Sequence, residues 1–452
     1  MSTHGGNEPP TAPSSARWPV WLPRAAPVAL VGAFAVLGVV SVFVVPWDVT
    51  QGRLGERAPP DEAAHFAYVR HLATQHSLPV FDSANADYES HQPPLYYALG
   101  VIAYAAASWA GTGAAYYAIR LLSVAIGACL VYLVWVFMSR LFPDDAHLPV
   151  AATGMAAFLP MHVAILSAIT NDGLAELVAT AILYICFTGL ASGFTGRRVV
   201  VVGALLGVGA LVKIGCLLLA PVALLAMALR MRQTRYDVSR LLWQWGLCLV
   251  VCLVVCGWWL VRSTKLYGDP LAMGAFREMF LAEDAARATP EWFFRRGYSL
   301  ATYVSVVVLW TWCSFWGVLG QANQFMPTWF YAVGAVLTLW AGVGCVRLCR
   351  RGLRGGTGME AVQRHTLLLL GAALALVLIA FVQFNREFFQ AQARYLFPAI
   401  APIVCFFALG WRELVPGRLR PYVLGALVAC LLGMSACALA PGLASDVLPW
   451  EH

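Results

Sequence analysis

The stretch "PPDEAAHFAYVRHLA" spans residues 59–73 and concentrates ionisable side chains in a very apolar chain. Asp61, Glu62, His65 and Arg70 follow soon after the apolar run 25–45. That run has the roughly 20 residues that a helix needs to cross the hydrocarbon of a bilayer. We therefore expect a first membrane helix at 25–45, followed by an external segment that carries chemistry.

The composition extends this expectation to the whole chain. Hydrophobic residues make up 60% and charged residues 12%, whereas soluble domains carry about 25% charged residues. The mean hydropathy is +0.71. The composition predicts an all-α polytopic membrane protein, with a net charge of +7 that reflects topology and not nucleic-acid binding. The cysteines fall in apolar runs and are expected to be small buried residues, not metal or redox groups.

Charge placement decides which apolar segments cross. Thirteen are visible, and we expect 10–13 membrane helices. The arginine-rich connectors 196–198, 230–240, 347–354 and 412–420 all become cytoplasmic only if segments 93–110 and 299–318 lie along the outer face. That topology has about 11 spans and a cytoplasmic N-terminus. The thirteen segments are 25–45, 93–110, 118–138, 148–168, 174–193, 199–212, 214–229, 241–261, 299–318, 326–346, 366–384, 396–411 and 421–441.

The same reasoning gives the domain organisation. Residues 1–24 are rich in Pro, Ser and Gly and should form a disordered cytoplasmic N-terminus. Residues 25–441 form one transmembrane domain in the plasma membrane. Its two large external loops are 46–117 and 262–325, and residues 442–452 form a short external tail.

The external segments carry most of the residues suited to chemistry. Carboxylates suit general-base catalysis, in which an acid group removes a proton from an attacking hydroxyl. Nearby cations suit phosphate binding, because arginine offers a bidentate fork. Acids and cations on one face of a membrane protein point to a phosphorylated lipid substrate. The candidate residues are Asp61, Glu62, His65, Glu89, His91, Gln92, Asp172, Lys213, Arg262, Arg394 and Tyr395.

The order of these motifs resembles a known superfamily. "DEAAHFAYVR" is followed by "YESHQPPLYYALG", then by "NDGLAELVA", "GALLGVGALVKIGCLLL" and "QARYLFP". This succession resembles the GT-C glycosyltransferases, membrane enzymes that use polyprenyl-phosphate sugars. Protein O-mannosyltransferases and the lipid A aminoarabinose transferase carry a similar Asp-Glu pair followed by a Pro-Pro-Leu element. The resemblance covers most of residues 27–411 and implies the GT-C fold.

The resemblance also implies roles for individual residues. Asp61 matches the catalytic base of the relatives, and Glu62 matches the acid that supports it or binds the acceptor. Asp172 matches the acid of the second external loop, and Arg394 lies where relatives place a cation near the lipid phosphate. The paired Asp-x-Asp turn of the oligosaccharyltransferases is absent, so we expect no firm metal requirement. Any divalent metal would fall to Asp61, Asp172 and His65.

Structural alternatives stand beside these roles. The acidic pair follows Pro-Pro and could simply stabilise the start of the next helix, and Asp172 could do the same for its own helix. Lys213 could snorkel to water, and Arg262 could anchor a helix end at the interface. His91 could be only a loop residue.

The expected function is transfer of a sugar from a polyprenyl-phosphate donor to an acceptor hydroxyl on the external face, with inversion. Mannose is the first expectation for the sugar and arabinofuranose the second. The acceptor could be a protein, glycan, lipid or natural product. A transporter or flippase for lipid-linked sugars, or a non-catalytic partner in envelope assembly, is the alternative. Charges in outer loops instead of at the midplane favour the enzyme.

Overall fold

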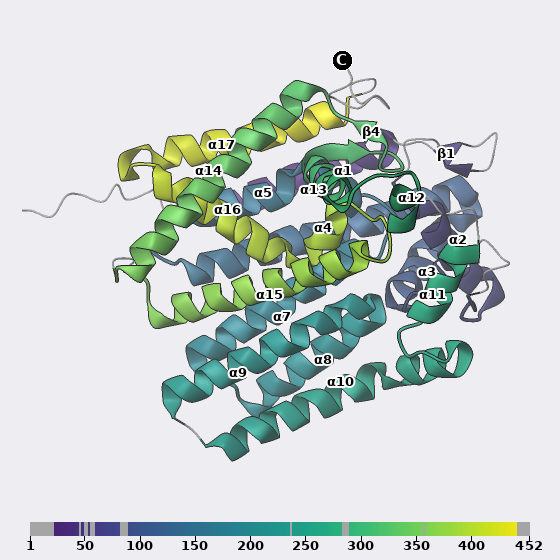
Figure 1. Cartoon of the computed structure of the whole chain (residues 1–452), viewed down its shortest axis with the longest axis horizontal. Coiled ribbons are helices and arrows are strands. Elements are labelled where there is room, and N and C mark those ends of the chain that lie inside the picture. The colour runs from purple at the N-terminus through teal and green to yellow at the C-terminus, as the bar shows by residue number, and fades with distance from the viewer. Residues whose placement is uncertain are drawn as a thin grey trace, which may run out of the picture.

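The computed structural model describes residues 22–44, 47–48, 53–54, 59–81, 89–235, 237–282, 289–355 and 358–440. Its secondary structure is almost entirely helical (Figure 1), which confirms the all-α prediction. Two short antiparallel hairpins complete it, β1 (Trp47–Asp48) with β2 (Arg53–Leu54) and β3 (Val318–Leu319) with β4 (Gln324–Phe325). The segments 1–24 and 442–452 were predicted to lie outside the membrane bundle. Of these, the structure describes only residues 22–24, which form the start of α1.

Ten helical segments of the described chain are long and apolar enough to cross a membrane, or 11 if one bent pair is counted. This agrees with the predicted number. The ten are α1 (Leu22–Val44), α4 (Thr112–Leu141), α7 (Asp172–Ser192), η2 (Ile214–Leu219) with α9 (Ala220–Thr234), α10 (Val238–Tyr267), α13 (Leu300–Gly317), α14 (Thr328–Leu353), α15 (Ala361–Asn385), η4 (Ala393–Ala399) with α16 (Ile400–Leu414), and η5 (Gly417–Leu419) with α17 (Arg420–Ala438).

The bent pair is α5 (His147–Phe158) and α6 (Pro160–Leu166), which meet at 61°. Proline at position 160 cannot continue the hydrogen bonding of α5, so the helix breaks there. The remaining helices are α2 (Glu62–Gln75), α3 (Leu95–Ala107), η1 (Ser108–Ala110), α8 (Gly196–Val212), α11 (Met273–Ala282) and α12 (Pro290–Arg295).

Two helices differ from the predicted set of membrane-spanning helices. The expected spans included 199–212, but α8 has 17 residues and is not among the ten. They excluded 299–318, yet α13 is long enough to qualify. Figure 1 shows α13 nearly end-on, whereas α7–α10 and α14–α17 run across the picture. Helix α13 therefore lies crosswise to the bundle, the arrangement expected for a segment along a membrane face.

Close helix packing holds the bundle together. A Cβ on Gly203 of α8 would lie 2.5 Å from the carbonyl oxygen of Cys248 on α10. A Cβ on Gly207 would lie 2.8 Å from the carbonyl oxygen of Cys252 on the same helix. Small residues four apart allow this approach, which is common between membrane helices. Both cysteines are buried and free, as is Cys256 one turn further on. These three are small packing residues, as predicted, whereas Cys129, Cys349 and Cys430 are exposed, so the prediction of burial is wrong for those three.

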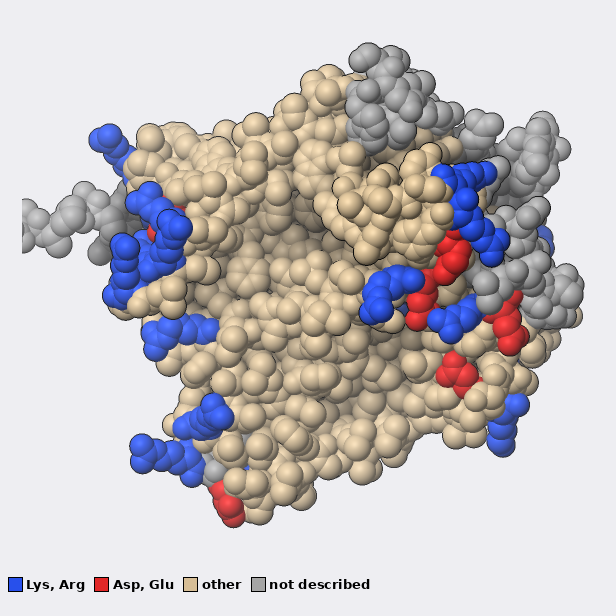
Figure 2. Space-filling model, in the orientation of Figure 1, with Lys and Arg blue, Asp and Glu red and all other residues tan. Residues whose placement is uncertain are grey.

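The two ends of the bundle differ in charge. Figure 2 shows a broad band without charged side chains between two charged ends. Arginines crowd the end that carries the α9–α10, α14–α15 and α16–α17 connections, whereas acids and cations mix at the end that carries α2, α3 and α11 (Figures 1 and 2). The candidate site lies at the mixed end.

Candidate functional site

A cavity of about 360 Å³ lies at the mixed-charge end, within the size range of small-molecule sites. The start of α2, the turn at 89–93, the α6–α7 turn, the break before η2, the start of α11, and α15 with η4 enclose it. The structure thus gathers residues that are more than 330 positions apart. All predicted site residues except Glu62 and Arg262 line this cavity: Asp61, His65, Glu89, His91, Gln92, Asp172, Lys213, Arg394 and Tyr395.

Asp61 has an unusual backbone conformation. Its φ of 65° and ψ of −3° lie in the left-handed region, which non-glycine residues adopt rarely and mostly where the surroundings enforce it. The residue directly precedes α2 without bonding to the helix start through its side chain, so capping does not explain it. Instead, its carboxylate forms an ion pair with Arg394 at the cavity wall. Burial alone would raise the pKa of Asp61, but the Arg394 guanidinium outweighs burial and holds the pKa below its usual value.

Arg394 comes from the opposite end of the chain, in the 3₁₀ segment η4. Its Nη2 donates to Asp61 Oδ2 and, at 3.3 Å, to the Tyr395 hydroxyl. The guanidinium lies 5.1 Å from the centroid of the Tyr395 ring, within cation–π range. These contacts fix a largely buried guanidinium beside a carboxylate, which suits an incoming phosphate that can exchange for the acid.

A second acid–cation pair faces the same cavity. Asp172 is the first residue of α7, where the helix dipole favours negative charge. Lys213, between α8 and η2, forms an ion pair with it. The Lys213 Nζ also lies 5.6 Å from the Tyr395 ring centroid. Tyr395 therefore lies between the two cations, and the snorkelling alternative for Lys213 does not describe its position.

His65 and Glu89 add two groups that are neutral at pH 7. Burial lowers the pKa of His65 to about 4, and its Nδ1 is hydrogen-bonded to the Tyr97 hydroxyl at 2.8 Å. Burial, reinforced by the nearby charge of Asp61, raises the pKa of Glu89 to about 8. Glu89 is thus a carboxylic acid at neutral pH, able to donate a hydrogen bond into the cavity. The two ion pairs leave the cavity with no net charge before a substrate enters.

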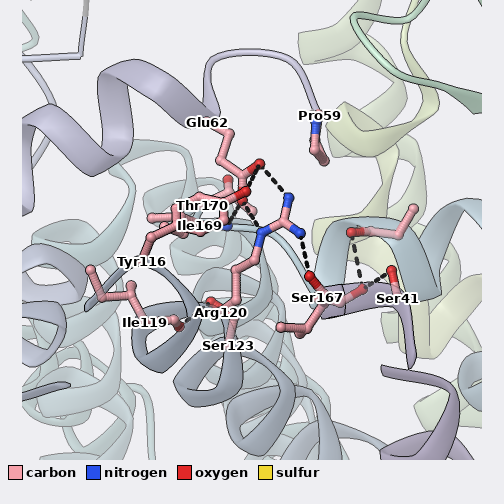
Figure 3. A network of polar contacts seen from close by, with 12 residues as sticks. Ser41, Pro59, Glu62, Tyr116, Ile119, Arg120, Ser123, Ser167, Ile169 and Thr170 are labelled. Atoms are coloured by element: carbon pink, nitrogen blue, oxygen red, sulfur yellow. Dashed lines mark hydrogen bonds and ion pairs between the residues drawn. The ribbon is translucent and has the colours of Figure 1, made fainter. Parts of the chain in front are cut away.

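Glu62 does not line the cavity, although it is adjacent to Asp61; its side chain meets Arg120 instead (Figure 3). Arg120 of α4 clamps its carboxylate, with Nε donating to Oε1 at 2.8 Å and Nη2 to Oε2 at 2.6 Å. The Tyr116 hydroxyl and the Ile169 backbone N–H donate to the same carboxylate at 3.2 and 2.8 Å. Glu62 therefore fixes the start of α2 to α4 and to the α6–α7 turn, and its neighbour Asp61 with it.

Arg262 also lies outside the cavity. Its Nη2 donates to the carbonyl oxygens of Pro79 at 2.8 Å and Leu78 at 3.5 Å. Its guanidinium lies 5.0 Å from the ring centroid of Trp259, which does line the cavity. This geometry makes Arg262 a support for the 78–81 segment and for the Trp259 wall.

Apolar side chains also line the cavity. They come from η2, α11 and α15, and they are those of Leu218, Met273, Phe276, Val377, Phe381 and Phe384. The cavity thus offers charged groups for a headgroup and apolar surface for a chain. Such an amphipathic arrangement fits a phosphorylated lipid.

The donor set does not fit a divalent metal well. Within the described residues, no group of three or more His, Cys, Asp and Glu side chains could hold an ion. Asp61 and Asp172 are each engaged by a cationic side chain, and His65 is engaged by Tyr97. Positive charge is supplied here by Arg394 and Lys213.

Sequence reasoning missed Arg120, Tyr97 and Trp259. Arg120 carried a usable signal, because it is the lone charge within the first two-thirds of a 30-residue apolar helix, and intramembrane charges are rarely without a role. The two aromatic residues carried none, since aromatic side chains are common throughout this chain.

Comparisons with known proteins identify the fold. No protein-family model and no curated protein sequence matches this chain. Among solved structures, ArnT from Cupriavidus metallidurans bound to undecaprenyl phosphate is 16% identical, with a TM-score of 0.51 over 91% of this chain and 71% of ArnT. The oligosaccharyltransferase of Archaeoglobus fulgidus, tethered to an acceptor peptide, is 15% identical, with a TM-score of 0.55 over 93% of this chain.

The same archaeal enzyme, AglB, was also solved with an inhibitory peptide and dolichol-phosphate, and it gives a TM-score of 0.54 at 14% identity. This chain spans little more than half of the archaeal enzyme, 55% and 56% in the two structures. The ArnT structure thus holds undecaprenyl phosphate and the AglB structure dolichol-phosphate. The likeness shows that this chain has the GT-C fold, which confirms the resemblance drawn from its motifs.

Proposed function

We propose that the protein is a membrane glycosyltransferase that moves a sugar from a polyprenyl-phosphate donor to an acceptor hydroxyl. The observation that carries the proposal is Asp61, held in a strained conformation beside Arg394 at a cavity lined by both charged and apolar side chains. The fold neighbours support the donor class, since their structures hold undecaprenyl phosphate and dolichol-phosphate. The proposed location is the plasma membrane, with the cavity external and the N-terminus cytoplasmic.

The proposed reaction begins with an exchange of partners. The donor phosphate takes Arg394 and Lys213, which leaves Asp61 buried without its cation. Burial then raises the pKa of Asp61 and makes it a stronger base. Asp61 accepts the proton of the acceptor hydroxyl, whose oxygen attacks the anomeric carbon in line. The bond from the anomeric carbon to the phosphate oxygen breaks, and polyprenyl phosphate departs with the electron pair.

The cations act on the departing phosphate. Preorganised charges that stabilise the group formed in the transition state accelerate a reaction, whereas equal binding of substrate and transition state does not. The leaving phosphate gains charge as the bond breaks, so Arg394 and Lys213 hold it more tightly than they hold the donor. Mannose remains the first proposal for the sugar and arabinofuranose the second.

The test is transfer in membranes from a panel of radiolabelled polyprenyl-phosphate sugars, with wild type beside Asp61→Asn. Loss of the general base should lower the rate by ~10²–10⁴-fold. The matched control is Asp144→Asn, the same change at an exposed acid in the turn between α4 and α5. Full transfer by a folded Asp61→Asn protein would exclude Asp61 as the base. Donor binding without transfer from any sugar would favour transport or an assembly role.

A further inference from the structure

Glu176 is a fully buried acid outside the cavity lining, and it has no part in the proposed reaction. Glu176 lies one turn after Asp172 on α7 and so on the same helix face. Its side chain has no exposed surface, and Oε2 lies 2.6 Å from Nε2 of His162, which is equally buried. Ionisable side chains at such depth in a membrane protein are costly and are usually retained for a purpose.

The local sequence explains why His162 is there. In an unbroken helix the carbonyl oxygen of Ala156 would accept a hydrogen bond from the residue at position 160. That residue is Pro160, which has no N–H. Nδ1 of His162 lies 2.6 Å from the Ala156 oxygen. A carbonyl oxygen only accepts, so Nδ1 carries a proton and replaces the missing backbone donor.

The other ring nitrogen must then share a proton with Glu176. A contact of 2.6 Å between Nε2 and Oε2 requires one proton between them. The pair is either imidazolium with carboxylate or imidazole with carboxylic acid, and both forms have no net charge. Oε1 of Glu176 is buried and has no hydrogen-bond partner in the described part of the chain.

The pair joins three elements that carry the candidate site. His162 belongs to α6 and Glu176 to α7, which presents Asp172 to the cavity. The rings of His162 and of Phe397 in η4 pack edge to face, with their centroids 5.3 Å apart. Phe397 follows Arg394 by three residues in the same 3₁₀ segment. A shift of this pair would therefore move both acid–cation pairs.

We propose that His162 and Glu176 are positioning residues, whose shared proton fastens α6 to α7 and η4 so that Asp172 and Arg394 keep their places in the cavity. The kinetic consequence rests on the proposed function. The structural consequence, the hydrogen-bonded state of His162, does not.

The test compares Glu176→Gln with Glu176→Ala. The amide of the glutamine can donate to Nε2 and keep the three elements joined, so kcat should stay near the wild-type value. Alanine removes the bond, and a small displacement of catalytic groups should lower kcat by about 10²-fold per folded molecule. The matched control is Glu413→Gln, a buried carboxylate bonded to Arg351 at the arginine-rich end.

A purely structural role would lower the yield of folded protein and leave kcat per folded molecule unchanged. Wild-type kcat in Glu176→Ala would overturn the proposal. Equal impairment of the glutamine and alanine variants would overturn it as well, since the hydrogen bond would then not suffice.

Nitrogen NMR of isotope-labelled histidine provides a readout that needs no transfer. Nδ1 of His162 should be protonated in wild type and in Glu176→Gln, and only the Nε2 signal should change in Glu176→Ala. An unprotonated Nδ1 in wild type would overturn the proposal. If wild type transfers no sugar, the proposed function fails, but binding of undecaprenyl phosphate and these signals still test the pair.

Discussion

At the scale of single residues, two adjacent acids have opposite surroundings. Asp61 faces the cavity and a single cation, whereas Glu62 is enclosed by four donors from three other residues. The left-handed backbone of Asp61 separates them, because it turns the chain just before α2 begins. The Glu62 clamp holds the start of α2 directly after this strained turn, and Arg394 contacts Pro60 and Asp61 within it.

Loss of Arg120 should show most clearly that the Glu62 clamp holds the turn at Asp61 in place. Arg120→Ala leaves a buried, uncompensated carboxylate, which should destabilise the fold by about 3–5 kcal/mol. Folded yield in detergent measures it. Replacing both partners, Glu62→Gln with Arg120→Met, removes the buried charges and should restore yield without restoring transfer. Arg140→Ala, a change at an exposed arginine of the same helix, serves as the control. Full transfer by the double variant would show that the clamp does not position Asp61.

The proposed reaction should depend on pH through Glu89. With a pKa of about 8, this group is neutral at pH 7 and becomes an anion as the pH rises through 8. The new charge would repel the donor phosphate and Asp61, so kcat/KM should fall above about pH 8. Glu89→Gln should remove that fall, since glutamine cannot ionise. His65, which titrates near pH 4, does not contribute in this range. An unchanged alkaline fall in Glu89→Gln would contradict the assignment.

Much of the site was predictable because its residue types are rare in this chain. Charged side chains in an apolar sequence stand out, so Asp61, Asp172 and Arg394 could be assigned to one place. The orientation of Glu62 could not, because it depends on one backbone angle. Arg262 was misplaced for a similar reason, since its partners are backbone carbonyls that no pattern reveals.

At the scale of elements, glycines allow the closest approaches between helices. Helices α14 and α16 approach so closely that a Cβ on Gly344 would lie 1.9 Å from the carbonyl oxygen of Gly410. No side chain could fit there, because the obstacle is backbone. The apolar pattern predicted both helices, but not that these glycines face each other.

Gly344→Ala should therefore force the two helices apart. Overpacking typically costs about 1–3 kcal/mol, and a backbone obstacle places this variant at the upper end. The measurement is Tm in detergent. Gly342→Ala provides the control on the same helix, because a Cβ there meets nothing within 4 Å. Equal Tm values for the two variants would show that the α14–α16 approach is looser than the structure has it.

At the scale of the whole molecule, the two charged ends imply a direction in the membrane. Arginines outnumber acids at one end, which the positive-inside rule assigns to the cytoplasm, and the cavity lies at the other (Figure 2). The rule predicted this separation from sequence, because connectors between spans are visible as charged interruptions. The same rule predicted that 299–318 lies along the outer face, although length and hydropathy alone make it resemble a span, and α13 does lie crosswise to the bundle (Figure 1).

Labelling of single cysteines in intact cells tests the direction and α13 together. A membrane-impermeant thiol reagent should reach Glu291→Cys at the cavity end, and should reach Asp144→Cys only after permeabilisation. Native Cys349, exposed among the arginines, provides an internal control for the cytoplasmic side. It is replaced in the other variants, and the exposed Cys129 and Cys430 are replaced throughout. Cysteines at Ser299 and Gln321, which flank α13, should both react from outside because the helix lies along one face. If the cysteines at Ser299 and Gln321 react from opposite sides, α13 spans the membrane. If the labelling at Glu291 and Asp144 is reversed, the cavity faces the cytoplasm.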